Sequence, residues 1–251
     1  MEFHTFGKKQ NSAVVLILGM LTPWQIWKKA IAYFSKDHYV IVPELDSHTE
    51  DTKSQFLSAE TEAKLIQEYL IKENKNRLYA LCGLSMGGRI AALLAGMEKI
   101  STQYLILDGA PLKKLPSFLI GFMKKNYVKI IRKTQARDPK VIADCKRNFL
   151  PEQLHPYFFK IADRMEPESI QLIIDSVFSA FEYKAYDRNT KILFMHGTGM
   201  NEFVSKKSAE MLKKENPQTV MQCFHGYAHA QLACFMPEQW VKTVSQFMMQ
   251  S

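Results

Sequence analysis

The chain has 251 residues, and 33 Lys and Arg against 25 Asp and Glu give it a formal net charge of +8. Hydrophobic residues make up 47% and charged residues 23%, an ordinary globular composition that excludes disordered, collagen-like and low-complexity chains. The length fits one large domain, or a core that carries an insertion.

The apolar runs are too short to cross a membrane. The longest one near the N-terminus, residues 13–21, falls well short of the roughly 20 residues of a spanning helix. No small-residue cleavage site follows it to mark a secretory signal. We therefore expect a soluble, cytoplasmic protein with no integral membrane contact.

Short apolar runs alternate with helical patterns along most of the chain, and the two kinds of element are taken here in chain order. Strands are predicted at residues 14–18, 39–42, 78–82, 104–107, 192–195 and 219–224. Helices are predicted at residues 24–35, 58–74, 86–97, 204–215 and 237–249. We expect Ser58 to cap the second helix and Pro43 to end the second strand. Such alternation predicts an α/β fold with a mostly parallel central sheet flanked by helices.

The alternation breaks once, between the fourth and fifth predicted strands. Residues 112–187 show only helical patterns, at 118–132, 139–148 and 167–183 among others. We therefore predict an α/β core formed by residues 1–111 and 188–251, with an all-helical cap or lid at residues 112–187 inserted between two late strands.

Cysteine usage points away from disulfides and zinc. The four cysteines are scattered and form no CxxC pair, which favours buried free thiols. They are Cys82, Cys145, Cys223 and Cys234.

The strongest local signal is the sequence Gly83-Leu84-Ser85-Met86-Gly87, which lies between a predicted strand and a predicted helix. A sharp strand-to-helix turn strains the backbone of the serine, so the residues two positions away must be small. The hydroxyl then stands at the carboxyl end of the sheet, beside the free N–H groups of a helix N-terminus. A merely tight turn is the alternative interpretation. The apolar strand before it and the helix after it favour a nucleophile.

A serine hydroxyl needs a base to remove its proton, and we expect that base on the loop after the last strand. Two histidines compete there, His225 and His229. Gly226 supplies a turn that lets the ring of His229 reach over the sheet edge, so we favour His229 and expect His225 to be structural. No HExxH sequence or carboxylate cluster accompanies them, so we expect no metal and no cofactor.

In these residues the chain resembles the α/β-hydrolase fold superfamily, and the resemblance covers nearly the whole length. Besides residues 83–88 and Gly226-x-x-His229, it rests on Leu18-Gly19-Met20 and on residues 42–48. The resemblance implies that Ser85 is the nucleophile, that His229 is the general base and that the helical insertion is a lid.

The same resemblance implies an oxyanion hole formed by two backbone N–H groups, those of Met20 and Met86. Leu18 stands where the family often has histidine, a change that leaves a backbone donor intact. We expect the family's opening hairpin to be largely absent from this chain, with residues 2–6 as its remnant.

The acid of the triad stays open between two residues. In the family it usually lies three residues after a glycine that follows the fifth strand, and Met200 occupies that position. Glu202, two residues further, could reach the histidine from a longer loop. Asp108, at the end of the fourth strand, matches the place from which other members draw the acid. Each carboxylate also has a purely structural interpretation. Glu202 could favour the N-terminal turn of the following helix, and Asp108 could cap a loop. We favour Glu202.

The predicted cap is strongly basic. Residues 112–149 carry eleven Lys and Arg against two Asp, so their positive charge exceeds the net charge of the whole chain. The apolar residues interleaved with them predict an amphipathic helix. The simpler interpretation is a solvated outer face. The functional one is weak contact with an anionic surface or an acidic substrate. No nucleic-acid-binding motif is visible, so we expect no nucleic-acid partner.

These features predict a serine hydrolase that cleaves a carboxylic ester, or a related acyl bond, of a small apolar substrate through an acyl-enzyme on Ser85. Thioesters and amides stay open as substrates, and so does the oligomeric state. The displaced acid motivates the alternative, a non-catalytic small-molecule-binding protein of the same fold.

Overall fold

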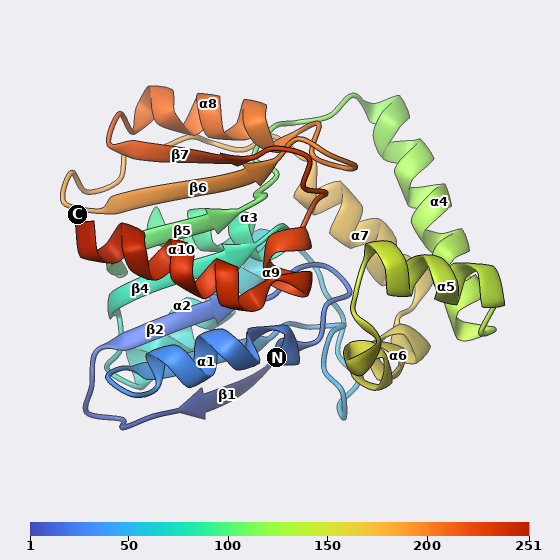
Figure 1. The fold of residues 1–251 in the computed structure, drawn as a ribbon, viewed down its shortest axis with the longest axis horizontal. Helices are drawn as coiled ribbons and strands as arrows, with labels where there is room; N and C mark the ends of the chain where they lie inside the picture. Colours follow the sequence, from blue (N-terminus) through green and yellow to red (C-terminus); the bar gives the residue numbers. More distant parts are fainter. Residues whose placement is uncertain (251) are drawn as a thin grey trace.

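The computed structural model describes residues 1–250 and is built around a seven-stranded sheet with the order β1-β3-β2-β4-β5-β6-β7 (Figure 1). Strands β2 to β7 run parallel, and β1 pairs antiparallel with β3. The predicted mostly parallel α/β sheet is therefore confirmed. The strands are β1 (Glu2–Phe6), β2 (Ala13–Ile17), β3 (Tyr39–Glu44), β4 (Arg77–Leu84), β5 (Ser101–Asp108), β6 (Lys191–Gly197) and β7 (Thr219–Phe224).

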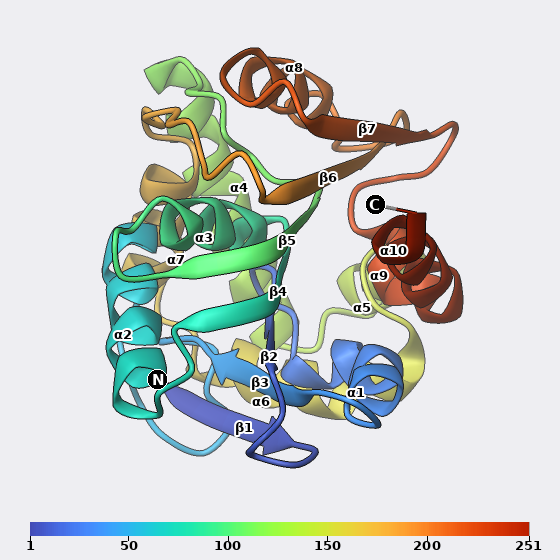
Figure 2. The same ribbon diagram turned by 90° about the vertical axis from the view of Figure 1, so that its left-hand side faces the viewer.

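Helices cover both faces of the sheet, and this is why the central strands are continuous apolar runs. Figure 2 shows α1, α9 and α10 on one face and α2, α3 and α8 on the other. Trp27 and Trp240 pack against each other between α1 and α10, with ring centroids 4.9 Å apart. These helices are α1 (Lys28–Phe34, preceded by the 3₁₀ turn Trp24–Trp27), α2 (Ala59–Lys72), α3 (Met86–Ala95), α8 (Ser205–Glu215), α9 (Gln231–Phe235) and α10 (Pro237–Gln250). The Ser58 hydroxyl caps α2 by accepting from the N–H of Thr61 at 3.1 Å, as expected.

The start of the sheet differs from the prediction in two respects. Residues 2–6, expected only as the remnant of a hairpin, form the strand β1, which pairs with β3 along its whole length. Pro43 does not end β3, which continues to Glu44, and Pro43 pairs with Phe3 of β1. Because β2 pairs with β3 only as far as Ile41, Pro43 lies where β3 has a single neighbour and no second ladder needs its missing N–H.

The segment between β5 and β6 is helical, and no strand occurs in residues 109–190. Figure 1 shows α4, α5 and α6 beyond the end of the sheet at which the parallel strands finish. The division into a core and a cap stays a prediction. The helices of the segment are α4 (Ser117–Gln135), α5 (Pro139–Asn148), α6 (His155–Arg164, preceded by the 3₁₀ turn Glu152–Leu154) and α7 (Pro167–Val177).

The last predicted helix of this segment is too long. Helix α7 ends at Val177 instead of residue 183, because the chain turns there toward the buried guanidinium of Arg89 in α3. Arg89 donates to the carbonyls of Val177 at 3.2 Å and Ala180 at 3.0 Å, and also to that of Pro111 at 3.3 Å. One side chain of α3 thus holds both ends of the helical segment.

Three of the four cysteines are buried free thiols, as expected: Cys82, Cys145 and Cys234. The expectation is wrong for Cys223, which is exposed because its strand, β7, forms the edge of the sheet. No helix within residues 1–250 is long and apolar enough to cross a membrane.

A pair of glycine substitutions tests the packing of α3 against β2. A Cβ atom on Gly87 would lie 2.4 Å from the carbonyl oxygen of Leu18, whereas a Cβ atom on Gly121 in α4 would meet nothing within 4 Å. We expect Gly87→Ala to lower the free energy of unfolding by about 2 kcal/mol or more, because backbone must move. Gly121→Ala should raise it by about 0.5–1 kcal/mol through helix propensity.

Equilibrium unfolding in urea measures both changes. Equal effects of the two substitutions would contradict the close approach of α3 to the end of β2.

Candidate active site

Ser85 occupies the sharp turn between β4 and α3 and has a φ of +52°, a strained value for a residue with a side chain. The two flanking glycines permit this turn. A Cβ atom on Gly83 would lie 2.2 Å from the carbonyl oxygen of Gly87. The N–H of Ser85 donates to the carbonyl of Asp108 at 2.7 Å, so the end of β5 holds the serine in place. The sequence requirement for small neighbours therefore has a direct steric cause.

The structure places His229 on this serine. Its Nε2 lies 2.8 Å from Ser85 Oγ, with each residue partly exposed. The imidazole packs directly on Gly109, where a Cβ atom would lie 2.8 Å from Cε1 of the ring. His225, which we expected to be a structural residue, is instead exposed at the turn before Gly226 (φ +81°).

Glu202 is the carboxylate that the structure brings to the other side of the imidazole. Its Oε1 lies 3.4 Å from His229 Nδ1, an ion-pair distance somewhat longer than a typical N–H···O bond. Burial alone would raise the pKa of this carboxyl. Attraction to His229, helped by the Ser205 side chain and the Gly197 backbone, instead holds it below its usual value. The buried side chain is therefore ionised at neutral pH.

Two backbone hydrogen bonds explain how a longer loop delivers this acid. The N–H of Gly199 donates to the carbonyl of Tyr227 at 2.8 Å, and the N–H of His229 donates to that of Met200 at 2.9 Å. They extend the pairing of β6 with β7 beyond the strands. Asn201 then adopts a φ of +65°, which leaves Met200 exposed and turns Glu202 inward.

Asp108, the alternative acid, lies deeper in the molecule. Its Oδ2 accepts a hydrogen bond from the indole N–H of Trp240 at 3.1 Å. Burial, together with the charge of Glu202, raises the pKa of Asp108 to about 7. Within residues 1–250 it forms no ion pair with His229. Glu202 and Asp108 therefore have different environments, and only Glu202 lies next to the imidazole.

Two backbone N–H groups, one shortly after β2 and one directly after Ser85, have no acceptor in the part of the chain that the structure describes. They belong to Met20 and Met86. Met86 is the first residue of α3, so its N–H belongs to the positive end of that helix. The end of β2 contacts the same helix at Gly87, which brings the loop of Met20 alongside. This arrangement leaves the N–H next to Ser85 and an N–H of the adjoining loop without partners.

His48 supports the loop that contains Met20, a role that the sequence pattern did not predict. Its Nε2 accepts from the N–H of Leu21 at 2.9 Å, and its Nδ1 faces the carbonyl of Asp46 at 3.0 Å. Leu21 has a φ of +60°, so this hydrogen bond fixes a strained turn directly after Met20. Complete burial lowers the pKa of His48 to about 4, and the neutral ring that results can accept from Leu21. His48 lies in residues 42–48, which belong to the family resemblance, but only the folded structure brings its ring to Leu21.

No group of three or more His, Cys, Asp or Glu side chains within residues 1–250 is arranged to hold a metal ion.

Several solved structures share this architecture, although no protein-family profile and no curated protein matches the sequence. One is MGS-M2, an α/β hydrolase from a Medee basin deep-sea metagenome library, with 12% identity over 100% of this chain and 94% of that chain and a TM-score of 0.78. Another is a carboxylesterase of Nitrososphaera gargenis, with 16% identity, coverage of 99% and 93%, and a TM-score of 0.75. A thermophilic esterase from Thermogutta terrifontis has 18% identity, coverage of 99% and 93%, and a TM-score of 0.74.

The topology and these similarities together identify the fold as that of the α/β hydrolases. The fold predicted by the sequence resemblance is therefore confirmed.

The pH dependence of stability tests the role of His48. Its pKa is about 4 in the folded protein and about 6.5 when unfolded, so between these values the unfolded chain binds more protons. The stabilising contribution of His48 is thus complete above about pH 6.5 and is lost as the pH falls toward 4. We expect the difference in unfolding free energy between wild type and His48→Gln to shrink by about 3 kcal/mol over this window.

Glu62 and Asp108 also have shifted pKa values, but they titrate in both proteins. Their contributions therefore cancel in the difference between the unfolding free energies of wild type and His48→Gln. A difference that does not change between pH 7 and pH 4 would show that His48 is not held neutral.

Proposed function

We propose that the protein is a serine hydrolase that cleaves a carboxylic ester, or a related acyl bond, through an acyl-enzyme on Ser85. The observation that carries the proposal is the 2.8 Å contact between Ser85 Oγ and His229 Nε2, made by a serine with a φ of +52° at a strand-to-helix turn. A strained, partly exposed serine in contact with an imidazole is the arrangement that activates a hydroxyl for attack.

In the first half of the proposed reaction, Ser85 Oγ attacks the substrate carbonyl while its proton passes to Nε2 of His229. The carbonyl oxygen becomes an oxyanion, and the N–H groups of Met20 and Met86 donate to it. Each such donor contributes roughly 3 kcal/mol to stabilisation of the transition state. The alcohol then leaves with the proton from Nε2, and the acyl group stays on Oγ.

In the second half, a water molecule attacks the acyl-enzyme and gives a proton to Nε2, which returns it to Ser85 as the acid product leaves. Glu202 stabilises the imidazolium that forms in each half and holds the tautomer with a proton on Nδ1. The 3.4 Å separation between Glu202 and His229 is compatible with this role, because such contacts shorten when substrate binds.

The position of the helical segment from residue 112 to 187 is consistent with an apolar substrate. We propose that it covers the end of the sheet where Ser85 stands and shields a small acyl or aromatic group from water, as a cap. Its placement beyond the strand ends in Figure 1 is the supporting observation.

Removal of the nucleophile is the direct test of the proposed activity. Wild type should hydrolyse short-chain p-nitrophenyl esters and react with a fluorophosphonate probe. We expect Ser85→Ala to lose about four orders of magnitude or more in kcat, and to lose labelling, because no group can then form the acyl-enzyme. Wild-type protein that binds such esters without turnover or labelling would instead support the non-catalytic alternative.

The choice of acid has its own test. We expect Glu202→Gln to lower kcat/KM by about 10²–10⁴-fold, because the imidazolium loses its adjacent charge. Asp108→Asn should change kcat/KM by less than about tenfold, because Asp108 binds Trp240 rather than His229. Ester hydrolysis by the two matched carboxyl-to-amide variants measures this. A larger loss in Asp108→Asn would reverse the assignment.

A further inference from the structure

Helix α4 buries few of its residues completely. Of its 19 residues only Ile131 and Thr134 are buried. Two phenylalanines near its N-terminal end, Phe118 and Phe122, are 74% and 63% exposed. Isolated exposed apolar side chains are ordinary, but two neighbouring aromatic rings on one helix face indicate a surface that contacts something apolar.

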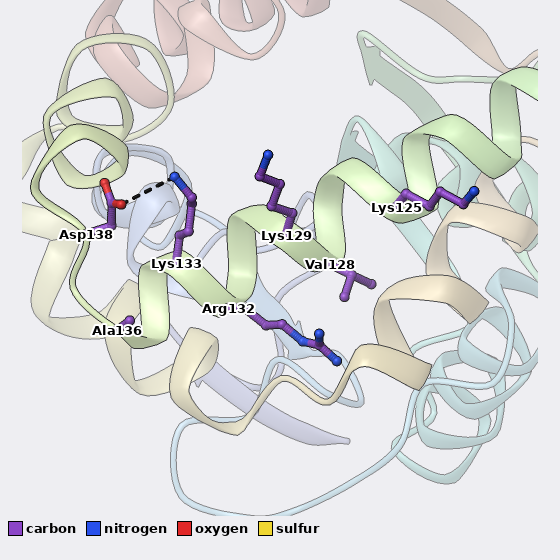
Figure 3. Close-up of a pocket in the computed structure, with 7 residues that line it drawn as sticks. All are labelled: Lys125, Val128, Lys129, Arg132, Lys133, Ala136 and Asp138. Carbon is purple, nitrogen blue, oxygen red and sulfur yellow. Dashed lines mark hydrogen bonds and ion pairs between the residues drawn. The ribbon is translucent and has the colours of Figure 1, made fainter.

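Five exposed residues of α4 lie on one face, because the spacings between them alternate between four and three residues and a helix turns roughly 100° per residue. We call this face the α4 stripe. It consists of Phe118, Phe122, Lys125, Lys129 and Arg132. The phenylalanines occupy its N-terminal end and the basic residues its C-terminal end. The three basic residues of the stripe also line a hollow of about 330 Å³ at this helix. Figure 3 shows their side chains extending from α4.

The three cations of the stripe are unpaired, whereas their basic neighbours are not. Within residues 1–250 no carboxylate lies within 4.0 Å of Lys125, Lys129 or Arg132. The neighbouring pairs are Lys124 with Asp175, Lys133 with Asp138 and Arg137 with Asp163. The stripe therefore presents positive charge that is available to an external anion.

We propose that the α4 stripe binds the surface of a membrane that contains anionic phospholipids. A helix with aromatic and basic residues on its outer face lies in the plane of such a surface, with the rings at the acyl boundary and the cations at the phosphates. In the α4 stripe the rings are gathered at one end rather than placed between the cations. This order fits a helix whose N-terminal end enters a lipid layer. It fits binding of a nucleic-acid strand less well, because a protein surface for that partner places aromatic and basic side chains in alternation along the strand's backbone.

Docking by this face also orients the rest of the molecule. Figure 1 places α4 beyond the end of the sheet where the parallel strands finish, and Ser85 stands at that end. A membrane that contacts the stripe would therefore lie on the same side of the protein as Ser85 and His229.

Co-sedimentation with vesicles tests the proposal on the full chain. We expect wild type to bind phosphatidylcholine vesicles with about one-third phosphatidylserine and to bind pure phosphatidylcholine far more weakly. Because each cation near an anionic surface strengthens partitioning about fivefold, the triple variant Lys125→Gln/Lys129→Gln/Arg132→Gln should lose about a hundredfold. Salt of about 1 M should release wild type.

Two matched controls separate the stripe from net charge and general hydrophobicity. Lys206→Gln/Lys213→Gln/Lys214→Gln removes the same charge from exposed, unpaired lysines of the described part of α8 and should lose less than about fivefold. Phe118→Ser/Phe122→Ser should lose about tenfold or more at every salt concentration at which wild type still binds, through lost burial of the rings. Leu57→Ser/Met249→Ser, at side chains 54% and 74% exposed, should bind like wild type.

Far-ultraviolet circular dichroism and the melting temperature establish that each variant is folded. Three outcomes would overturn the proposal. They are wild type that does not bind the anionic vesicles, equal losses in the α4 and α8 triple variants, and tight binding of a single-stranded RNA by wild type that the vesicles fail to compete.

Discussion

The short contact between Ser85 and His229 depends on segments that lie 144 residues apart in the chain. Parallel strands make this possible, because the carboxyl ends of β4 and β7 lie at the same end of the sheet and the residues that follow each strand begin there. Every other feature of the site is arranged around that end. Asp108 at the end of β5 accepts from the N–H of the serine, and the loop after β6 carries Glu202 to the histidine.

Close backbone approach is the steric condition for this arrangement. Side chains are excluded where β4 turns into α3, where α3 meets the end of β2, where the imidazole lies on the chain after β5, and where the loops after β6 and β7 pair. The residues at these places are Gly83, Gly87, Gly109, Gly197 and Gly199. The strain at Ser85 and Leu21 persists because the sheet and its hydrogen bonds fix the surrounding backbone.

Charge at the site is separated between two buried carboxyls. Burial and the charge of Glu202 raise the pKa of Asp108 to about 7, while the imidazole keeps Glu202 ionised although it is buried. Two nearby buried anions would repel each other, so Asp108, which lies against Trp240, keeps its proton to a higher pH than Glu202, which lies against His229. The same reasoning applies to His48, whose neutral state is set by burial and is needed to accept from Leu21.

The sequence by itself determined the six parallel strands of the sheet, the Gly-x-Ser-x-Gly turn and the helical character of residues 112–187. These follow from apolar periodicity and local sterics, which act over a few neighbouring residues. It narrowed the acid to Glu202 or Asp108 but could not place either, because the answer depends on how the loop after β6 pairs with the loop after β7. Only the tertiary structure decided which carboxylate meets the imidazole, that Pro43 lies within β3, that His48 supports Leu21, and which cations of α4 lack partners. Each of these depends on contacts between distant segments, and a local pattern carries no information about them.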